Sequence, residues 1–515
     1  MVNPSTDRLL VQRFADQMFS RAAGAALVGG NAVRVLRDGT ENFPAWEEAI
    51  AGAGATIHIE MYIFRHDRTG LRFVDLLARR ARAGVEVRVL YDWFGSGLSA
   101  ARGVFRPLLE AGGEVRASNP PSIRAPLGWV SRNHRKLIVV DGRVAFVSGL
   151  CIGREWEGVP DKGREPWRDT GVELIGPVVA DAEHVFAASW RRAGGVIPVV
   201  EGSGARAARA GDIDIALDVG VEGERAADER TVGTQTAGGN PASAAPVNVR
   251  LISTEPFAAN LLRMDLLVCS LARRTLWITD AYFIGSGSYV DALRRASEDG
   301  VDVRLLLPRG SDVGWTVPVS RSLYRPLLES GVRIFEWQGT MIHAKTAVAD
   351  GLWSRVGSTN LNLNGWVGNW ELDVAIEDKG VAGTMEGHYL EDLTRSTEIF
   401  AELHFAPRRP AVWLARRRWR PRSAQRMART ATRFGTAIGA VVLGRRALET
   451  MEAKPIVGMG LALLTGGAVL FLAPRLVAWP LAVIAAWGGI VFLVDAAMLW
   501  RRRPRRTKDT SAGSD

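Results

Sequence analysis

Cysteine and lysine are scarce in this chain, and each scarcity has a consequence. Its 515 residues include only two cysteines, Cys151 and Cys269. No disulfide framework can therefore hold the fold, and a reducing compartment is indicated. Only six of the 65 basic residues are lysine, and only seven residues are histidine. With 47% hydrophobic and 23% charged residues, the chain has the composition of a globular protein, long enough for two or three domains.

A long apolar run is missing near the N-terminus, and acidic residues are missing from two arginine-rich runs near the C-terminus. Residues 1–30 predict an amphipathic helix rather than a signal peptide. Residues 406–433 contain ten arginines and no acid, and residues 501–506 add five more arginines. Both basic runs flank apolar segments, which favours a role at a membrane surface over one in nucleic-acid binding.

Two of the few lysines belong to a motif that occurs twice. Asn-His-Arg-Lys-Leu-Ile-Val-Val-Asp-Gly begins at Asn133, and Ile-His-Ala-Lys-Thr-Ala-Val-Ala-Asp-Gly begins at Ile342. In a strand, residues i and i+2 share a face, so each His lies beside its Lys. Asp-Gly then predicts a hairpin turn. Such a pair suits a phosphate, because Lys supplies a compact positive charge and His can attack or transfer a proton. Two ordinary hairpins with polar starts are the alternative, which the repetition disfavours.

The similarity between the two parts of the chain extends beyond this motif. Residues 56–64 match 275–284, residues 77–91 match 293–307, and residues 105–112 match 324–331. We predict strands at 56–64, 85–91, 114–117 and 170–175, and helices at 43–51, 70–83 and 105–111. The alternation predicts an α/β fold with a largely parallel sheet. The duplication predicts two halves packed about a pseudo-two-fold axis, with both motifs in one cleft.

Composition divides the chain into seven segments. Residues 201–246 are rich in Gly, Ala and mixed charge, with almost no aromatic residues, which is typical of a linker. The predicted segments are an amphipathic segment (1–30), a first half (31–200), the linker (201–246), a second half (247–405), an Arg-rich juxtamembrane region (406–454), two transmembrane helices (455–500) and a basic tail (501–515).

The predicted transmembrane helices rest on two apolar stretches. Residues 456–473 carry no charge, and residues 476–500 carry one acid, Asp495. Each approaches the length needed to cross about 30 Å of hydrocarbon. The arginine runs outside both ends place both flanks in the cytoplasm by the positive-inside rule. We therefore expect a transmembrane hairpin in the cytoplasmic (inner) membrane, with the catalytic halves facing the cytoplasm. A buried helical hairpin in a soluble core is the alternative.

With these motifs, the chain resembles the phospholipase D superfamily, whose mark is a duplicated His-x-Lys-x4-Asp motif. The resemblance covers about residues 31–405. Residues 59–64, 92–96 and 369–374 are most similar to the bacterial cardiolipin synthases. The resemblance implies two tandem α/β/α halves and a two-step displacement at phosphorus through a phosphohistidine, without metal or cofactor. The motif residues implied in catalysis are His134, Lys136, Asp141, His343, Lys345 and Asp350.

The resemblance also implies individual roles. His134 is the expected nucleophile, and His343 is the expected acid, which then activates the incoming alcohol. Lys136 and Lys345 would hold the non-bridging oxygens in place of a metal. Because Asp141 and Asp350 sit in tight turns, we interpret them as structural supports rather than proton carriers.

Further side chains are expected to support the motifs. By the resemblance, Asp169 and Glu371 would each orient the histidine of the other half. Ser358 and Asn360 would bind the phosphate. Cys151 stands where the family has Asn in the first motif, and a thiol is a weak hydrogen-bond donor, so part of the first phosphate cradle departs from the family.

The leading functional interpretation is a membrane-bound phosphatidyltransferase that makes cardiolipin from phosphatidylglycerol. Its expected partners are an anionic phospholipid and the membrane, without nucleic acid; no sequence signal indicates an oligomeric state. One alternative is a phospholipase D that uses water as acceptor, since acceptor choice depends on how wet the closed site is. A nucleic-acid phosphodiesterase and a non-enzymatic membrane scaffold with a decayed site are further alternatives.

Overall fold

The computed structural model describes residues 16–121, 130–159, 163–197 and 245–400, and beyond them only Val483, Ala486 and Trp487. All but these last three belong to one compact unit, Met1–Glu402. In this part of the chain, no helix has the length and apolar character needed to cross a membrane. The predicted linker (201–246), juxtamembrane region and basic tail, and nearly all of the predicted transmembrane hairpin, lie outside the described residues.

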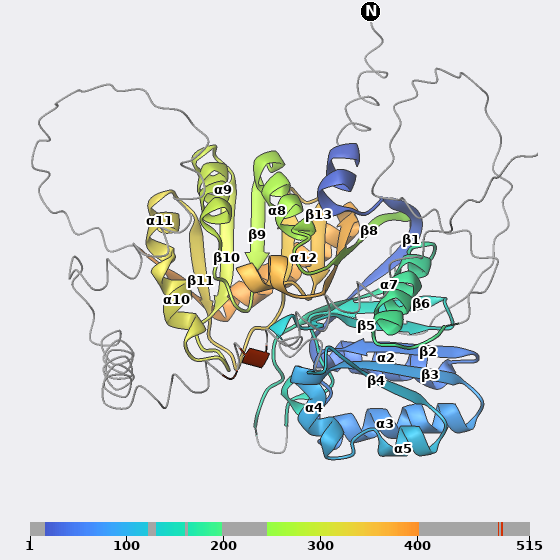
Figure 1. The fold of residues 1–515 in the computed structure, drawn as a ribbon. Coiled ribbons are helices and arrows are strands. Elements are labelled where there is room, and N and C mark those ends of the chain that lie inside the picture. The colour runs from blue at the N-terminus through green and yellow to red at the C-terminus, as the bar shows by residue number, and fades with distance from the viewer. Residues whose placement is uncertain are drawn as a thin grey trace, which may run out of the picture. The chain divides into compact units, whose positions relative to one another are not determined.

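Two halves follow each other with the same order of elements (Figure 1). A short helix, residues 16–23, precedes them. The first half contains β1 (Val28–Arg37), α2 (Asp38–Gly52), β2 (Thr56–Met61), α3 (Arg68–Arg82), β3 (Glu86–Asp92), α4 (Trp93–Ala101), α5 (Arg106–Glu110), β4 (Glu114–Ser118), β5 (Lys136–Val140), β6 (Val144–Ser148), α6 (Arg154–Glu157), β7 (Thr170–Ile175) and α7 (Val178–Arg192). The second half contains β8 (Val247–Thr254), α8 (Asn260–Leu271), β9 (Thr275–Thr279), α9 (Gly287–Glu298), β10 (Asp302–Pro308), α10 (Thr316–Ser322), α11 (Tyr324–Glu329), β11 (Arg333–Trp337), β12 (Thr346–Ala349), β13 (Trp353–Gly357), the π-helical turn η3 (Asn364–Gly368), β14 (Glu371–Glu377), α12 (Lys379–Thr394) and β15 (Ser396–Ile399).

The strands form one sheet in the order β15-β11-β10-β9-β12-β13-β14-β8-β1-β7-β6-β5-β2-β3-β4. This order reads alike from the central β8–β1 pair toward each end, apart from the added β15, as expected for two halves about a pseudo-two-fold axis. The prediction of a largely parallel sheet is wrong. Among the strands of the described residues, only β2–β3–β4 and β9–β10–β11 pair in parallel. Each motif instead begins a hairpin, and hairpin strands pair antiparallel, as β5 does with β6 and β12 with β13.

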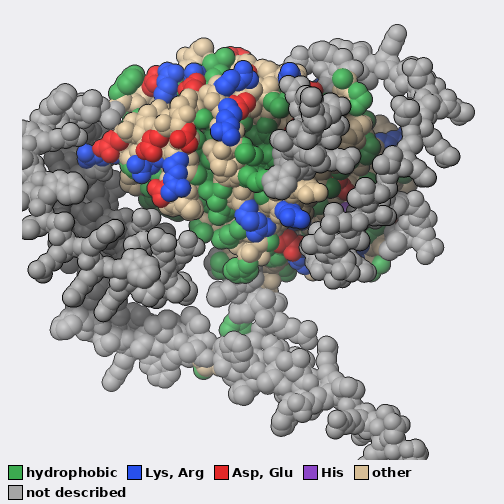
Figure 2. Space-filling model, turned by 90° about the horizontal axis from the view of Figure 1, so that it is seen from above, with side chains coloured by type: hydrophobic (Ala, Val, Ile, Leu, Met, Phe, Trp, Pro, Cys, Tyr) green, Lys and Arg blue, Asp and Glu red, His purple; other side chains and the backbone are tan. Residues whose placement is uncertain are grey.

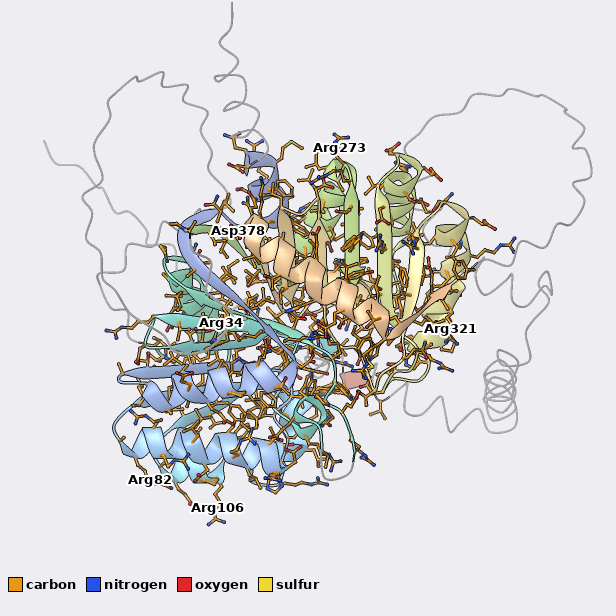
Figure 3. The ribbon with its side chains drawn as sticks, turned by 180° about the vertical axis from the view of Figure 1, so that it is seen from behind. Arg34, Arg82, Arg106, Arg273, Arg321 and Asp378 are labelled. Carbon is orange, nitrogen blue, oxygen red and sulfur yellow. The ribbon has the colours of Figure 1, made fainter. Side chains whose placement is uncertain are left out.

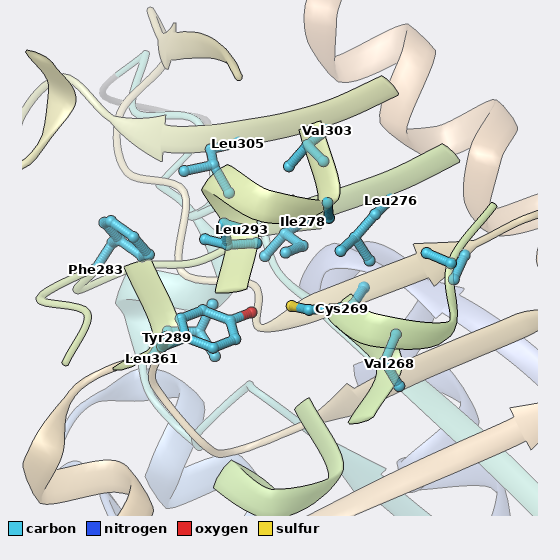
Figure 4. Close-up of a cluster of buried hydrophobic side chains, with 14 of the residues drawn as sticks. Val268, Cys269, Leu276, Ile278, Phe283, Tyr289, Leu293, Val303, Leu305 and Leu361 are labelled. Carbon is cyan, nitrogen blue, oxygen red and sulfur yellow. The ribbon is translucent and has the colours of Figure 1, made fainter. Parts of the chain in front are cut away.

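Buried apolar residues lie on both faces of the sheet. In β5, Ile138 and Val140 face a cluster shared with α2 and α3, whereas Leu137 and Val139 face a cluster that contains residues of α7, α12 and both halves. Alternation along the strand thus buries both of its faces. A third cluster fills the second half, where Figure 4 shows the Tyr289 hydroxyl directed toward Cys269. Both cysteines of the chain are free and buried.

Charged side chains are distributed over both halves. On the face that Figure 2 shows, Lys and Arg side chains are interspersed with Asp and Glu side chains. Side chains of both charge signs therefore share this face. Figure 3 labels arginines from both halves, among them Arg34, which pairs with Glu173.

Candidate active site

The two motifs lie against each other because each is hydrogen-bonded to the opposite half. The backbone N–H of His134 donates to the carbonyl of Trp370 (2.9 Å), and that of His343 donates to the carbonyl of Arg168 (2.7 Å). These cross-half bonds precede the strands: β5 begins only at Lys136 and β12 only at Thr346. We expected each His and its Lys to lie in the same strand. Instead, each strand begins after the histidine, and the backbone at the histidine pairs with the other half.

Each histidine contacts a carboxylate of the opposite half. The Nδ1 atom of His134 lies 2.9 Å from Oε2 of Glu371, and the Nδ1 atom of His343 lies 2.7 Å from Oδ2 of Asp169. Glu371 begins β14 and Asp169 immediately precedes β7, so the cross-half backbone bonds bring each carboxylate to its histidine. A carboxylate at Nδ1 places the ring proton there and leaves Nε2 free to react.

The two lysines complete a dense positive cluster. Lys136 and Lys345 are both almost fully buried, and each donates to the carbonyl of its own histidine. Lys345 Nζ also lies 2.9 Å from Nδ1 of His343. Burial lowers the pKa of Lys136, and it lowers the pKa of Lys345 to about 8. Two buried ammonium groups that act on the same histidine form a site suited to a phosphate.

Burial and the lysines also keep the histidines neutral. Burial, followed by Lys136 and Lys345, lowers the pKa of His134 well below its usual value. Burial and Lys345 lower the pKa of His343 to about 4. Since lysines of both motifs act on His134, the two motifs share one site.

The pKa values of the two carboxylates are shifted in opposite directions. Burial raises the pKa of Glu371 to about 7, although Lys136 and a hydrogen bond from Ser358 partly offset it. Burial also acts to raise the pKa of Asp169, but His343 and Lys345 together hold it below its usual value. Asp169 is thus ionised at neutral pH, whereas Glu371 is poised near its titration point.

The remaining predicted residues occupy different places. The Ser358 hydroxyl donates to Glu371 (2.6 Å), and Oδ1 of Asn360 is buried without a hydrogen-bond partner in the part of the chain that the structure describes. Asp141 lies at the far end of β5, about 16 Å along the strand from Lys136 at about 3.3 Å per residue. Its carboxylate accepts backbone N–H bonds from residues 54, 55 and 56. Asp350 does the same for residues 273, 274 and 275.

Several aromatic residues around the histidines were not singled out as site residues in the sequence analysis. The ring centroid of Tyr62 lies 4.6 Å from that of His134, and that of Tyr282 lies 5.9 Å from that of His343. The Trp156 indole N–H donates to Asp169 (3.0 Å). The repeat itself marks Tyr62 and Tyr282, because they occupy matching positions in 56–64 and 275–284. No local pattern marks Trp156.

The described residues include no group of three or more His, Cys, Asp or Glu side chains placed to hold a metal ion.

The chain is similar to known proteins in sequence and in fold. Residues 46–154 and 268–393 match the family model described as "Cardiolipin synthase, PLD-like domain". The crystal structure of phosphatidylserine synthase from Haemophilus influenzae Rd KW20 has the same fold, with a TM-score of 0.51 and 13% identity over 76% of this chain and 95% of that one. The chain belongs to the phospholipase D superfamily.

Within that superfamily, the chain is similar to cardiolipin synthases. It is 29% identical to "Probable cardiolipin synthase YwiE" of Bacillus subtilis (strain 168), over 74% of this chain and 69% of that protein. It is 28% identical to a cardiolipin synthase of Listeria monocytogenes serotype 4a (strain HCC23), over 74% of this chain and 73% of the relative.

Proposed function

We propose that this chain is a membrane-bound phosphatidyltransferase that makes cardiolipin from phosphatidylglycerol through a phosphohistidine. The observation that carries the proposal is the pair of buried His–Lys motifs, each histidine held at Nδ1 by a carboxylate of the other half. Similarity to cardiolipin synthases over most of the chain supports the choice of substrate.

In the first step, Nε2 of His134 attacks the phosphorus of the donor lipid, and the bond from phosphorus to the headgroup glycerol oxygen breaks. His343 gives its proton to that leaving alkoxide. In the second step, His343 takes the proton of the acceptor hydroxyl, whose oxygen attacks phosphorus and releases His134. Glycerol and cardiolipin are then the products of two phosphatidylglycerol molecules.

The charges around each histidine support this division of roles. Burial and Lys345 keep His343 neutral in the free site, and the ionised Asp169 stabilises the imidazolium that an acid requires once substrate binds. The anionic phosphodiester also favours that imidazolium when it binds. Neutral His134 keeps a free lone pair on Nε2, as a nucleophile requires. Lys136 and Lys345 stabilise the charge that gathers on the non-bridging oxygens.

The supporting residues receive roles that match their contacts. We assign Asn360 to the phosphate side, where its amide N–H can donate to a non-bridging oxygen. Ser358 already donates to Glu371, so we assign it chiefly to holding that carboxylate. Asp141 and Asp350 bind the backbone at strand starts far from the histidines, and we assign them a structural role.

The membrane part of the proposal rests on the apolar character of residues 455–500. We propose that they form a transmembrane hairpin in the cytoplasmic membrane, that residues 406–454 lie on its anionic cytoplasmic surface, and that residues 31–200 and 247–405 are the two catalytic halves. Each basic residue near such a surface contributes about 1 kcal/mol of attraction. The full chain should resist both salt and carbonate extraction; release by carbonate would refute the hairpin.

The decisive experiment incubates the full chain with labelled phosphatidylglycerol in EDTA and quantifies cardiolipin, phosphatidic acid and glycerol. Cardiolipin with an equal amount of glycerol, absent with His134→Ala, supports the proposal. Phosphatidic acid without cardiolipin makes the protein a phospholipase D. Loss of all products in EDTA, restored by a divalent ion, overturns the mechanism. No product under any condition favours a scaffold, and cleavage of DNA in place of lipid favours a nucleic-acid phosphodiesterase.

A further inference from the structure

We propose that exposed apolar side chains on two matching helices form a membrane-docking rim, which seats the active site on the surface of an anionic phospholipid bilayer. The rim comprises Trp93, Phe94 and Leu98 of α4, and Trp315 and Val319 at α10. The inference rests on the proposed function, because only a lipid substrate requires the site to meet a bilayer.

The rim residues are unusually exposed for their size. Trp93 is 38% exposed, Phe94 47% and Leu98 68%. In the other half, Trp315 is 63% and Val319 38% exposed. Trp and Phe are the side chains favoured where protein meets the headgroup region of a bilayer.

Contacts connect the first group to the catalytic residues. α4 begins directly after Asp92, whose carboxylate accepts the backbone N–H of Asn133 (2.8 Å), next to His134. The Arg132 guanidinium lies 4.1 Å from the centroid of Phe94 and donates to the Tyr62 hydroxyl (3.4 Å). Tyr62 in turn packs against His134. Phe94 is therefore two contacts away from a residue that touches the nucleophile.

The second group is connected in a corresponding way. Tyr282 packs against His343, and its hydroxyl donates to Asp312 (2.6 Å), which precedes Trp315 in the same loop. α10 follows β10 as α4 follows β3, so the two helices are counterparts in the repeat. Figure 1 shows them on either side of the junction between the halves. The rim thus lies on both sides of the site.

A bilayer fits this arrangement better than a protein does. A protein seated on both groups would cover the site and exclude the substrate, whereas a bilayer delivers it. The exposed Arg102 follows α4 and, with Arg132, suits anionic headgroups. Asp312, an acid close to Trp315 in the sequence, accepts a hydrogen bond from the Tyr282 hydroxyl.

Labelling of single introduced cysteines tests the rim without relying on catalysis. Because Cys151 and Cys269 are buried, a thiol introduced by Leu98→Cys or Val319→Cys can be labelled selectively with a fluorophore. The matched controls are Leu109→Cys and Leu352→Cys, at exposed apolar positions (53% and 48%). Leu109 precedes the start of β4, and Leu352 lies in the turn after β12, at the ends of the strands opposite the histidines.

Each labelled full chain is reconstituted into phosphatidylglycerol-containing vesicles whose acyl chains carry a quencher. We expect quenching at Leu98→Cys and Val319→Cys and none at the two controls. Equal quenching at all four positions, or none at the rim positions, would overturn the rim. So would a spectral change at the rim labels that grows with protein concentration in micelles, because it would indicate a second copy as the occupant.

A rate comparison adds a functional readout. With Leu98→Gln and Trp315→Gln combined, the ratio of turnover on vesicles to turnover on water-soluble short-chain phosphatidylglycerol should fall at least about tenfold, which corresponds to about 1.4 kcal/mol. Leu109→Gln with Leu352→Gln should leave the ratio unchanged. An equal loss on both substrates would mean a catalytic rather than a docking defect. Quenching does not depend on the reaction, so failure of the rim and failure of the proposed function remain distinguishable.

Discussion

The two halves have the same elements, yet they surround their catalytic pairs differently. Asp169, the partner of His343, accepts an indole N–H from Trp156 and packs against Gly149, where a Cβ would lie 2.1 Å from its Oδ1. Glu371, the partner of His134, has Ser358 at the position matching Gly149 and accepts its hydroxyl. The shorter carboxylate is held ionised and the longer one is poised to titrate. A duplicated fold has thus produced two unlike histidine–carboxylate pairs, and the proposed acid and nucleophile roles depend on this difference.

Removal of one histidine at a time is the strongest test of this difference between the two histidine–carboxylate pairs. His134→Ala should lower the rate by about 10³ or more, because the covalent route is lost. His343→Ala should block only protonation of the leaving group, so a substrate with a good leaving group should trap a phosphoenzyme, detected by mass spectrometry. Phosphate mapped to His343 in the His134→Ala chain would reverse the assignment.

The matched pair Gly149→Ala and Ser358→Ala examines how each carboxylate is held. The new Cβ at position 149 must displace the Asp169 side chain, and a misplacement of about 1 Å can cost about 10² in rate. Ser358→Ala removes one hydrogen bond to Glu371, worth about 1.5 kcal/mol or about tenfold. Steady-state rates check both.

Gly52→Ala is the control for the glycine change, because a Cβ at that position meets no atom within 4 Å. A Gly149→Ala chain as active as the Gly52→Ala chain would show that the placement of Asp169 does not matter.

The titration of the two carboxylates should also differ. Burial raises the pKa of Glu371 to about 7; once protonated, it donates to Nδ1 of His134 and moves the ring proton to Nε2, which cannot then attack. The ratio of the wild-type rate to the Glu371→Gln rate should therefore fall about tenfold from pH 8 to pH 6. Asp169 is ionised throughout this range, so the ratio for Asp169→Asn should stay level. The same slope for both variants would contradict the asymmetry.

Much of the architecture could be predicted from the sequence because the repeat supplies each signal twice. The strands predicted at 56–64, 85–91 and 170–175 correspond to β2, β3 and β7, and the two-half α/β fold is confirmed. The alternation of strands and helices predicts a parallel sheet, but it carries no information about the hairpin in the middle of each half. Those hairpins contribute the antiparallel pairs.

The parts of the site that depend on contacts between the halves were harder to predict from the sequence. His134 and His343 precede their strands because the backbone at these positions pairs with residues 370 and 168 of the other half, and local periodicity carries no trace of such pairing. The roles assigned to His134, His343, Asp169 and Glu371 stay predictions that the variants above test. The transmembrane hairpin likewise stays a prediction.

The smallest expected effect concerns the indole that distinguishes the two halves. Trp156 and Trp366 lie in matching segments, α6 and η3, but Trp156 donates to Asp169, whereas Trp366 donates to Asp265 (3.2 Å). Trp156→Phe removes one N–H from the carboxylate that supports His343, which should slow the reaction by a few-fold, about the value of one hydrogen bond. Trp366→Phe removes a comparable buried bond away from both histidines and should leave the rate unchanged at a similar loss of thermal stability. Equal slowing by both variants would show that the Trp156 indole acts through stability alone and not through its hydrogen bond to Asp169.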